Sequence, residues 1–308
     1  MQIFYSGGFP YYTPQEIDNL LGYGIKNRLF SYHFVQQDPK MYDGFKYIEE
    51  KYPDYGVMMD SGAFSVAMKG AKVNIEEYAG FLEKHKHSIT VPVNLDVVPA
   101  GQSTLKNLEE GAIEGWANLE YMESKGLKVL HTYHSAEDDK WLYKMMDKFE
   151  YFGVSKTGDV EGVMGRLDRV FSKLCDKNGR CRWKVHGFAV TSPTMMTRYP
   201  WATVDSASWV KYGCYGVVVM FKNGKFVSIG MSDRKKTLWA KKGQHYNNLN
   251  KVEKRLWEDE MERRGVNRDI LQDNRERDIW NIRSFLDLEK WLTEQDIRFK
   301  PKRSIFII

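Results

Sequence analysis

The sequence has few of the features that identify a protein class at first sight. It contains only three cysteines, Cys175, Cys181 and Cys214, and these form neither a disulfide framework nor a zinc-ligand spacing. No apolar run approaches the roughly 20 residues that a membrane helix needs. The first residues lack a basic segment followed by a long apolar one, so we expect no secretion signal. These absences predict a soluble protein of the reducing cytoplasm.

Motifs for nucleotide cofactors and for serine hydrolases are also missing. Neither a Walker A nor a Gly-x-Gly-x-x-Gly sequence occurs. Ser61 precedes a glycine, but the Gly-x-Ser-x-Gly context of a nucleophile elbow is absent. His131 and His134 form a His-x-x-His pair without a third ligand at a clear spacing. The sequence therefore predicts neither a cofactor nor a metal.

Positive charge is concentrated near the C-terminus. The chain holds 46 Lys and Arg against 41 Asp and Glu, a net charge of +5, and residues 232–303 hold 19 basic and 14 acidic residues. The whole excess therefore lies in this segment. Its densest part surrounds Trp239 and consists of Arg234, Lys235, Lys236, Lys241 and Lys242. Such a cluster suits a polyanion, and a solvated basic surface is the structural alternative.

Short β-rich runs alternate with helical patterns over about 210 residues. The candidate strands are Gln2–Ser6, Arg28–Phe34, Val57–Asp60, Ile89–Leu95, Lys128–Tyr133, Tyr151–Ser155, Lys184–Val190 and Thr203–Ser206. Helical patterns lie between them at 13–21, 38–51, 74–87, 103–125, 137–149 and 159–175, and a shorter one follows Ser192-Pro193. Eight strands with intervening helices predict a (β/α)8 TIM barrel of the α/β class, with an open doubly wound sheet as the alternative.

The pattern changes after the eighth strand. Val217–Phe221 and Phe226–Ile229 flank Asn223-Gly224, which predicts a β-hairpin. Two amphipathic helices are expected to follow and to pack on the barrel, with apolar stripes at Leu249, Val252, Leu256 and Met261, and at Ile279, Ile282, Phe285, Leu286 and Leu292. We therefore expect a catalytic barrel over residues 1–212 and a β-hairpin with a basic helical extension over residues 213–308.

Carboxylates occur where three of the predicted strands end, at Asp60, Asp96 and Asp205. The carboxyl ends of barrel strands converge on one pocket, where enzymes of this fold carry their active sites. A buried carboxylate costs several kcal/mol unless it is paired, bound to metal or used in chemistry. Each aspartate alone could simply cap a helix. Three of them at the same rim predict an active site.

Five short segments follow one another along the predicted strand ends. They are Asp60-Ser-Gly-Ala-Phe-Ser65, Val93-Asn-Leu-Asp-Val-Val-Pro99, Phe152-Gly-Val-Ser-Lys-Thr-Gly-Asp159, Val185-His-Gly-Phe-Ala-Val-Thr-Ser-Pro193 and Tyr199-Pro-Trp-Ala-Thr-Val-Asp-Ser206. Together they resemble motifs of the tRNA-guanine transglycosylase superfamily, whose fold is a (β/α)8 barrel. Ala63 and Ser65 replace the family's usual Gly and Gln, and nothing after Cys214 could supply its zinc site. The compact chain most resembles the phage-encoded branch that inserts 7-deazaguanine derivatives into DNA.

The resemblance implies a base exchange at C1′ of a guanine nucleotide. Asp205 would attack C1′ and Asp60 would act first as acid and then as base, a division of roles that mirrors retaining glycoside hydrolysis. Asp96 would accept hydrogen bonds from N1–H and the exocyclic amine of guanine, and Phe64 would stack on the base. The further substrate-binding candidates are Ser61, Gly62, Asn94, His134, Gly153 and Phe188.

The partners implied are a nucleic acid, DNA in preference to tRNA, and a free 7-deazaguanine base, with no membrane. The basic residues 234–242 would contact phosphates. Three alternatives stay open: a tRNA (queuine-type) transglycosylase, a non-catalytic nucleic-acid-binding homologue, and a barrel glycosidase acting on small molecules. The presence of both Asp60 and Asp205 argues against the second, and the third leaves the basic cluster unused.

Overall fold

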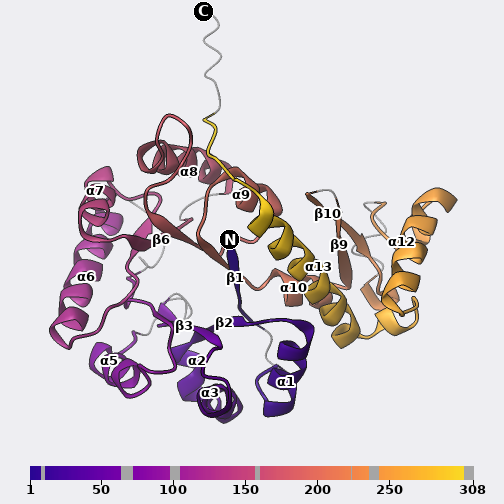
Figure 1. The fold of residues 1–308 in the computed structure, drawn as a ribbon, viewed down its shortest axis with the longest axis horizontal. Helices are drawn as coiled ribbons and strands as arrows, with labels where there is room; N and C mark the ends of the chain where they lie inside the picture. The colour runs from indigo at the N-terminus through magenta and orange to yellow at the C-terminus, as the bar shows by residue number, and fades with distance from the viewer. Residues whose placement is uncertain are drawn as a thin grey trace, which may run out of the picture. The chain divides into compact units, whose positions relative to one another are not determined.

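The computed structural model describes residues 1–7, 11–63, 72–97, 105–156, 160–222, 224–235 and 243–301. Its contacts divide the chain into two compact units, Met1–Ser206 with Asp296–Ile308, and Ala207–Gln295. Within the described ranges, no helix combines the length and the apolar character that crossing a bilayer requires. Figure 1 shows the elements of both units along the chain.

The first unit is built on eight parallel strands in the order β4-β3-β2-β1-β8-β7-β6-β5. They are β1 (Gln2–Tyr5), β2 (Asn27–Ser31), β3 (Gly56–Asp60), β4 (Val91–Pro92), β5 (Thr132–His134), β6 (Tyr151–Ser155), β7 (Lys184–Phe188) and β8 (Thr203–Ser206). A parallel bridge between Val93 and Leu130 joins the two ends of this order, and Leu130 N donates to Pro92 O at 2.7 Å. The strands thus form a (β/α)8 barrel, and the predicted fold class is confirmed.

Helices surround these strands, as Figure 1 shows. They are α1 (Pro14–Tyr23), α2 (Tyr32–Gln37), α3 (Pro39–Lys51), α5 (Ile75–Lys84), α6 (Leu105–Ser124), α7 (Asp139–Lys148), α8 (Val160–Leu174) and α9 (Pro193–Arg198). Several begin at a side-chain cap: Asn74 accepts from Glu76 N and Glu77 N, and Ser192 accepts from Met195 N. These caps satisfy backbone donors that the first helical turn leaves without a partner.

The strand predicted over Arg28–Phe34 is wrong in its second half. β2 ends at Ser31, and the next residues form the short helix α2. Tyr32 packs on α5 instead of extending the sheet, with its ring centroid 4.9 Å from that of Tyr78 and 5.2 Å from that of Phe81. The aromatic residues favour a strand locally, and this tertiary contact overrides that preference.

Interior side chains of the strands fill the barrel. Phe4, Met58, Val93 and Leu130 form one buried cluster, against which the partly buried Phe188 packs. Tyr78 of α5 is fully buried, and its hydroxyl lies 2.9 Å from Met59 O and 2.7 Å from Val93 O. The Tyr78 hydroxyl therefore links the end of β3 to the residue after β4, immediately before the polar residues Asp60 and Asn94.

The second unit contains α10 (Ser208–Cys214), β9 (Val217–Lys222), β10 (Lys225–Gly230), η1 (Asp233–Lys235), η2 (Tyr246–Asn248), α12 (Lys251–Arg264), η3 (Ile270–Gln272) and α13 (Asn274–Glu294). β9 and β10 pair antiparallel, with Lys225 opposite Lys222, which confirms the predicted hairpin. Gly224 adopts φ 76° in the turn, and Asn223 lies outside the described residues. The core of this unit includes Val218, Ile229 and Trp280.

The apolar stripe predicted on the first C-terminal helix is wrong in part. Val252 is 75% exposed and Leu256 is 47% exposed, whereas Trp257 and Met261 are buried. Trp257 joins the core beside Trp280, with ring centroids 6.4 Å apart. Burying this large aromatic residue sets the inward face of α12, because it removes more apolar surface from water than Val252 would.

Removing the Tyr78 hydroxyl should lower stability without changing the fold. We expect Tyr78→Phe to reduce the free energy of unfolding by about 1–2 kcal/mol, because the carbonyls of Met59 and Val93 lose a buried donor. Urea denaturation measures the difference. Tyr121→Phe is the matched control, since no hydrogen bond of its hydroxyl occurs in the described part of the chain. Equal stability of the two variants would contradict this role.

Candidate active site

Three carboxylates lie at the carboxyl ends of barrel strands. Asp60 is the last residue of β3, Asp205 lies in β8, and Asp96 follows β4 by four residues. Because all eight strands are parallel, these ends belong to the same mouth of the barrel. The side chains of Asp96 and Asp205 are 23% and 12% exposed. They are therefore accessible from the mouth while most of their surface is enclosed.

The surroundings of Asp60 keep its carboxyl group partly protonated near neutral pH. Burial raises the pKa of Asp60, and the charges of Asp96 and Asp205 raise it further, to about 7, against the opposing hydrogen bonds from Gly62 N and Ser61 N. The three carboxylates are therefore within electrostatic reach of one another. A carboxyl group that titrates close to neutrality can both donate and accept a proton, as general acid–base catalysis requires.

The protein holds the two oxygens of Asp205 differently. Oδ1 accepts a 2.6 Å hydrogen bond from Ala189 N and lies 3.6 Å from Nε2 of His186. Oδ2 is contacted by Ser6 Oγ at 3.5 Å, a long contact that restrains it less. Oδ1 is thus fixed, and Oδ2 is the freer oxygen for bond formation.

Ala189 makes its short hydrogen bond from an unfavourable backbone conformation. Its φ is 52°, and within the described ranges it is the one non-glycine residue with positive φ. For a residue with a Cβ this region costs about 1–2 kcal/mol. The loop after β7 therefore accepts local strain while directing an N–H at Asp205.

A chain of hydrogen bonds orients His186 next to Asp205. The imidazole is fully buried, and its Nδ1 lies 2.7 Å from Thr203 Oγ1, which in turn lies 2.7 Å from Tyr151 OH. This chain fixes the ring so that Nε2 faces the carboxylate. Nε2 of His186 has no hydrogen-bond partner among the described residues, so the ring packs beside Asp205 without hydrogen-bonding to it.

Asp96 and His134 form an ion pair in the same mouth. His134 Nε2 lies 2.8 Å from Asp96 Oδ1. Burial acts to lower the pKa of His134, but the charge and hydrogen bond of Asp96 outweigh it and raise the pKa to about 9. Burial likewise acts to raise the pKa of Asp96, and the charge and hydrogen bond of His134 lower it overall. At neutral pH Asp96 is thus an ionised acceptor beside an imidazolium.

Two further titratable groups lie beside this pair. Burial, together with the charge of Asp96, raises the pKa of Glu137 to about 7, and its Oε2 accepts from His134 N at 3.3 Å. Burial lowers the pKa of His131 to about 4, so this ring is neutral, and Asn94 Nδ2 donates to its Nδ1 at 3.0 Å. The amide of Asn94 also donates to Gly115 O, while its Oδ1 has no partner among the described atoms.

The Ser61-Gly62 turn directs Asp60. Gly62 has φ 79°, and a Cβ at this position would lie 2.4 Å from Ser31 Oγ, so only glycine fits. Gly62 N donates to Asp60 Oδ2 at 3.3 Å, and Ser61 Oγ accepts from Ala63 N at 3.2 Å. The predicted stacking residue, Phe64, lies outside the described residues.

Gly153 and Phe188 are brought into direct contact. A Cβ at Gly153 of β6 would lie 2.4 Å from Cε2 of the Phe188 ring. The ring also packs edge-on against His186, with centroids 4.4 Å apart. Gly153 thus leaves the space that Phe188 occupies at the end of β7, beside the residues that hold Asp205.

Sequence reasoning missed His186, Ala189 and Glu137. His186 shares one face of β7 with Phe188, so strand alternation alone could have indicated it. Positive φ at Ala189 leaves no sequence signal, because glycine is the usual marker. Of the predicted basic residues, Arg234 and Lys235 belong to η1 of the second unit, and the rest of the cluster, Lys236, Lys241 and Lys242, lies outside the described residues.

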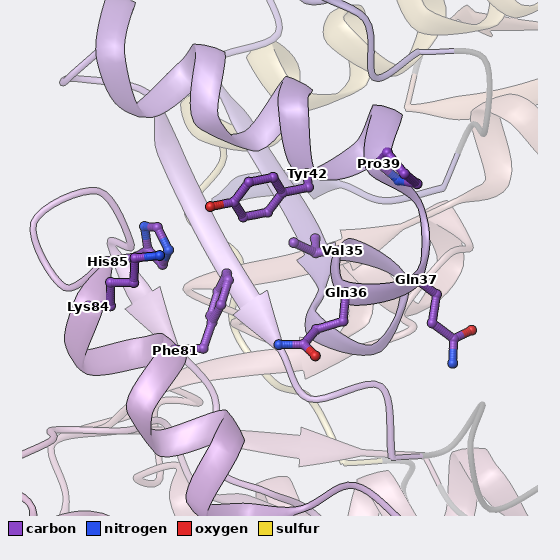
Figure 2. Close-up of a pocket in the computed structure, with 8 residues that line it drawn as sticks. All are labelled: Val35, Gln36, Gln37, Pro39, Tyr42, Phe81, Lys84 and His85. Carbon is purple, nitrogen blue, oxygen red and sulfur yellow. The ribbon is translucent and has the colours of Figure 1, made fainter.

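A separate cavity of about 470 Å³ lies among α2, α3 and α5. Figure 2 shows Tyr42, Phe81 and His85 around it. His85 Nδ1 donates to Glu49 Oε1 at 2.8 Å, and its Nε2 has no hydrogen-bond partner among the described residues. None of the three strand-end carboxylates lines this cavity, so the acid–base candidates stay with the barrel mouth.

Within the described ranges, no group of three or more His, Cys, Asp or Glu side chains is arranged to hold a metal ion. A scan against protein-family models found no match, and a search of curated proteins found none either.

The raised pKa of Asp60 predicts a pH-dependent stability. The protonated carboxyl favours the folded state fully below about pH 4, and this contribution is lost as the pH rises through about 7. Asp60→Asn removes the titration. Between about pH 5 and pH 8 the Tm of the wild type should therefore fall a few degrees more than that of Asp60→Asn, since about 1 kcal/mol moves Tm by about 2–4 °C.

Differential scanning fluorimetry over this pH range measures the two curves. Asp43→Asn, at an exposed position of α3, should instead follow the wild-type curve. Parallel curves for wild type and Asp60→Asn would show that Asp60 does not titrate near neutrality.

Adding a methyl group at Gly153 should displace Phe188. We expect Gly153→Ala to destabilise the protein by about 1–3 kcal/mol, because the new Cβ overlaps the ring. Trimming the ring in Gly153→Ala/Phe188→Leu should recover most of the loss. Thermal unfolding measures both variants, and a double variant less stable than the single one would rule out this steric explanation.

Proposed function

We propose that this protein is a guanine transglycosylase, a pentosyltransferase that exchanges guanine in a nucleic acid, DNA in preference to tRNA, for a 7-deazaguanine derivative. The observation that carries the proposal is the group formed by Asp60, Asp96 and Asp205 at one barrel mouth, with the pKa of Asp60 raised to about 7. The resemblance of the five strand-end segments to guanine transglycosylases supplies the reaction that these carboxylates would perform.

In the first step Oδ2 of Asp205 attacks C1′ of the target nucleotide. The C1′–N9 bond breaks as the Oδ2–C1′ bond forms, and Asp60 gives its proton to the departing guanine. Support comes from the two environments. The pKa of Asp60 is raised to about 7, and Oδ1 of Asp205 is held by Ala189 N while Oδ2 is less restrained.

In the second step the 7-deazaguanine base replaces guanine in the pocket. Asp60, now ionised, takes the N9 proton of the incoming base, and N9 attacks C1′ and displaces Asp205. Exchange rather than hydrolysis requires that water does not reach C1′ between the two steps. The proton lost in the first step is recovered in the second, so the enzyme returns to its starting state.

Asp96 is the candidate for recognising the base. Guanine presents N1–H and the exocyclic amine as adjacent donors, which suit an ionised carboxylate. The ion pair with His134 keeps Asp96 ionised, although it uses part of Oδ1. Phe188 at the end of β7 is a candidate for contact with the face of the base.

The identity of the polymer is tested by supplying DNA and tRNA in parallel. Strands labelled with radioactive guanine are incubated with enzyme and a free 7-deazaguanine base, and label release is followed. We expect release from the DNA. Release from tRNA alone would favour the queuine-type alternative, and release from neither would favour a non-catalytic homologue. Release from a free nucleoside without polymer would favour a small-molecule glycosidase.

Replacing the proposed nucleophile should separate chemistry from binding. We expect Asp205→Asn to abolish the covalent protein–oligonucleotide adduct that forms when no incoming base is supplied, because an amide cannot attack C1′ at a useful rate. Denaturing electrophoresis detects the adduct, and fluorescence anisotropy should show nearly unchanged binding. Asp43→Asn is the matched control and should form the adduct normally. Guanine exchange by Asp205→Asn at the wild-type rate would remove the nucleophile assignment.

A further inference from the structure

The second unit contains a cavity of about 610 Å³ that the proposed chemistry does not use. It lies between the turn η1 and the start of α13. Its lining residues are Cys214, Ser232, Asp233, Arg234, Lys235, Gln272, Asp273, Asn274 and Arg277. Three of these side chains are cationic and two are anionic, so the character of the cavity depends on which charges are already paired.

Both carboxylates of the cavity are occupied by other groups. Asp233 Oδ1 lies 2.6 Å from Arg268 Nη2 and accepts from Asn247 Nδ2 at 3.2 Å. Asp273 is the N-cap of α13 and accepts from Arg275 N at 2.7 Å and Glu276 N at 3.3 Å. Asp233 is therefore paired with a cation outside the cavity lining, and the Asp273 carboxylate accepts from the helix backbone, although its charge still acts on Arg277.

Among the residues that the structure describes, the cations of the cavity, in contrast, form no ion pair with a carboxylate. Arg234 and Lys235 are exposed and make no side-chain hydrogen bond or ion pair within the described part of the chain. Arg277 is only 4% exposed, and it donates to carbonyl oxygens, including Gly213 O at 3.1 Å and Gln272 O at 2.7 Å. Burial lowers the pKa of Arg277, the charges of Asp278 and Asp273 partly oppose this, and the charge of Arg234 adds a smaller lowering effect. An anion between these two guanidinium groups would relieve their repulsion.

The basic turn is also held in a fixed position. Gly216 O accepts from Met231 N at 2.8 Å and from Ser232 N at 3.1 Å, at the entry to η1. A Cβ at Gly216 would lie 2.9 Å from Cβ of Lys235, so the turn packs directly on the glycine backbone. The stem of Lys235 is therefore positioned by close packing, and its ammonium group remains available.

We propose that this cavity binds a phosphate group through Arg234, Lys235 and Arg277. Tetrahedral oxyanions match the forked donors of arginine and the point charge of lysine. That the phosphate belongs to a nucleic-acid backbone rests on the proposed function. The phosphate site itself does not.

Cys214 provides a built-in reporter, because it is exposed and lines the cavity. We expect inorganic phosphate, and separately an oligonucleotide, to slow alkylation of Cys214 by the neutral reagent iodoacetamide. At a ligand concentration ten times Kd the rate should fall about tenfold, since only the unoccupied fraction reacts. Mass spectrometry follows Cys175 and Cys181 of the first unit in the same sample, and their rates should not change.

Matched variants test the residues. Arg234→Gln and Lys235→Gln should each weaken protection, and each should reduce by about 1 the slope of log K against log salt for oligonucleotide binding. Lys251→Gln, at an exposed position of α12 outside the cavity lining, should leave protection of Cys214 unchanged.

The outcomes separate this site from the proposed function. Protection by both ligands that is lost in the two variants supports the site, and protection by oligonucleotide alone restricts it to phosphodiesters. Protection by inorganic phosphate alone keeps the site and overturns the nucleic-acid source. Protection by neither ligand, or protection that is unchanged in both variants, overturns the site even if guanine exchange is observed. Protection without any guanine exchange overturns the proposed function and leaves the phosphate site.

Discussion

The protonation of the barrel mouth depends on the burial of one carboxyl group, Asp60, beside two others. Burial makes ionisation of Asp60 costly, and the charges of Asp96 and Asp205 add to this cost, so the pKa of Asp60 rises to about 7. The other two carboxylates differ in their surroundings: His134 pairs with Asp96, while Ala189 N donates to Asp205 and His186 packs beside it. The mouth thus contains one carboxyl group that titrates near neutrality beside another that a backbone N–H holds, which is the division of roles that the proposed base exchange needs.

Contacts with residues behind the carboxylates hold these groups in position. Tyr78 joins β3 to the end of β4, the Thr203–Tyr151 hydroxyl pair orients His186, and Gly153 leaves room for the Phe188 ring. Each contact connects different elements of the barrel, so the site depends on several strands rather than on a single loop. Strain at Ala189 fits this picture, because an unfavourable φ persists only where the surrounding structure enforces it.

The sequence pattern predicts the barrel and its carboxylates because both depend on regular features. Strand periodicity and the rule that barrel sites lie at carboxyl ends lead directly to Asp60, Asp96 and Asp205. Helix α2 and the inward face of α12 were predicted incorrectly, because Tyr32 and Trp257 are placed by tertiary packing rather than by local preference. The pairing of His134 with Asp96, and of His186 with Asp205, joins residues far apart in the chain, which a single sequence does not reveal.

The ring of strands is joined by very different amounts of backbone pairing at different points. β2 and β3 share five register pairs, whereas β1 and β2 share one, Tyr5 with Arg28, and a single bridge between Val93 and Leu130 connects the β4 and β5 sides. Local opening costs less where fewer ladder bonds must break. The bridge between Val93 and Leu130 lies beside the segments that carry Asp96 and His134. Local separation of the strands at this bridge would therefore lengthen the ion pair between these two residues. Separation of the strands at this bridge is thereby linked to the distance between Asp96 and His134.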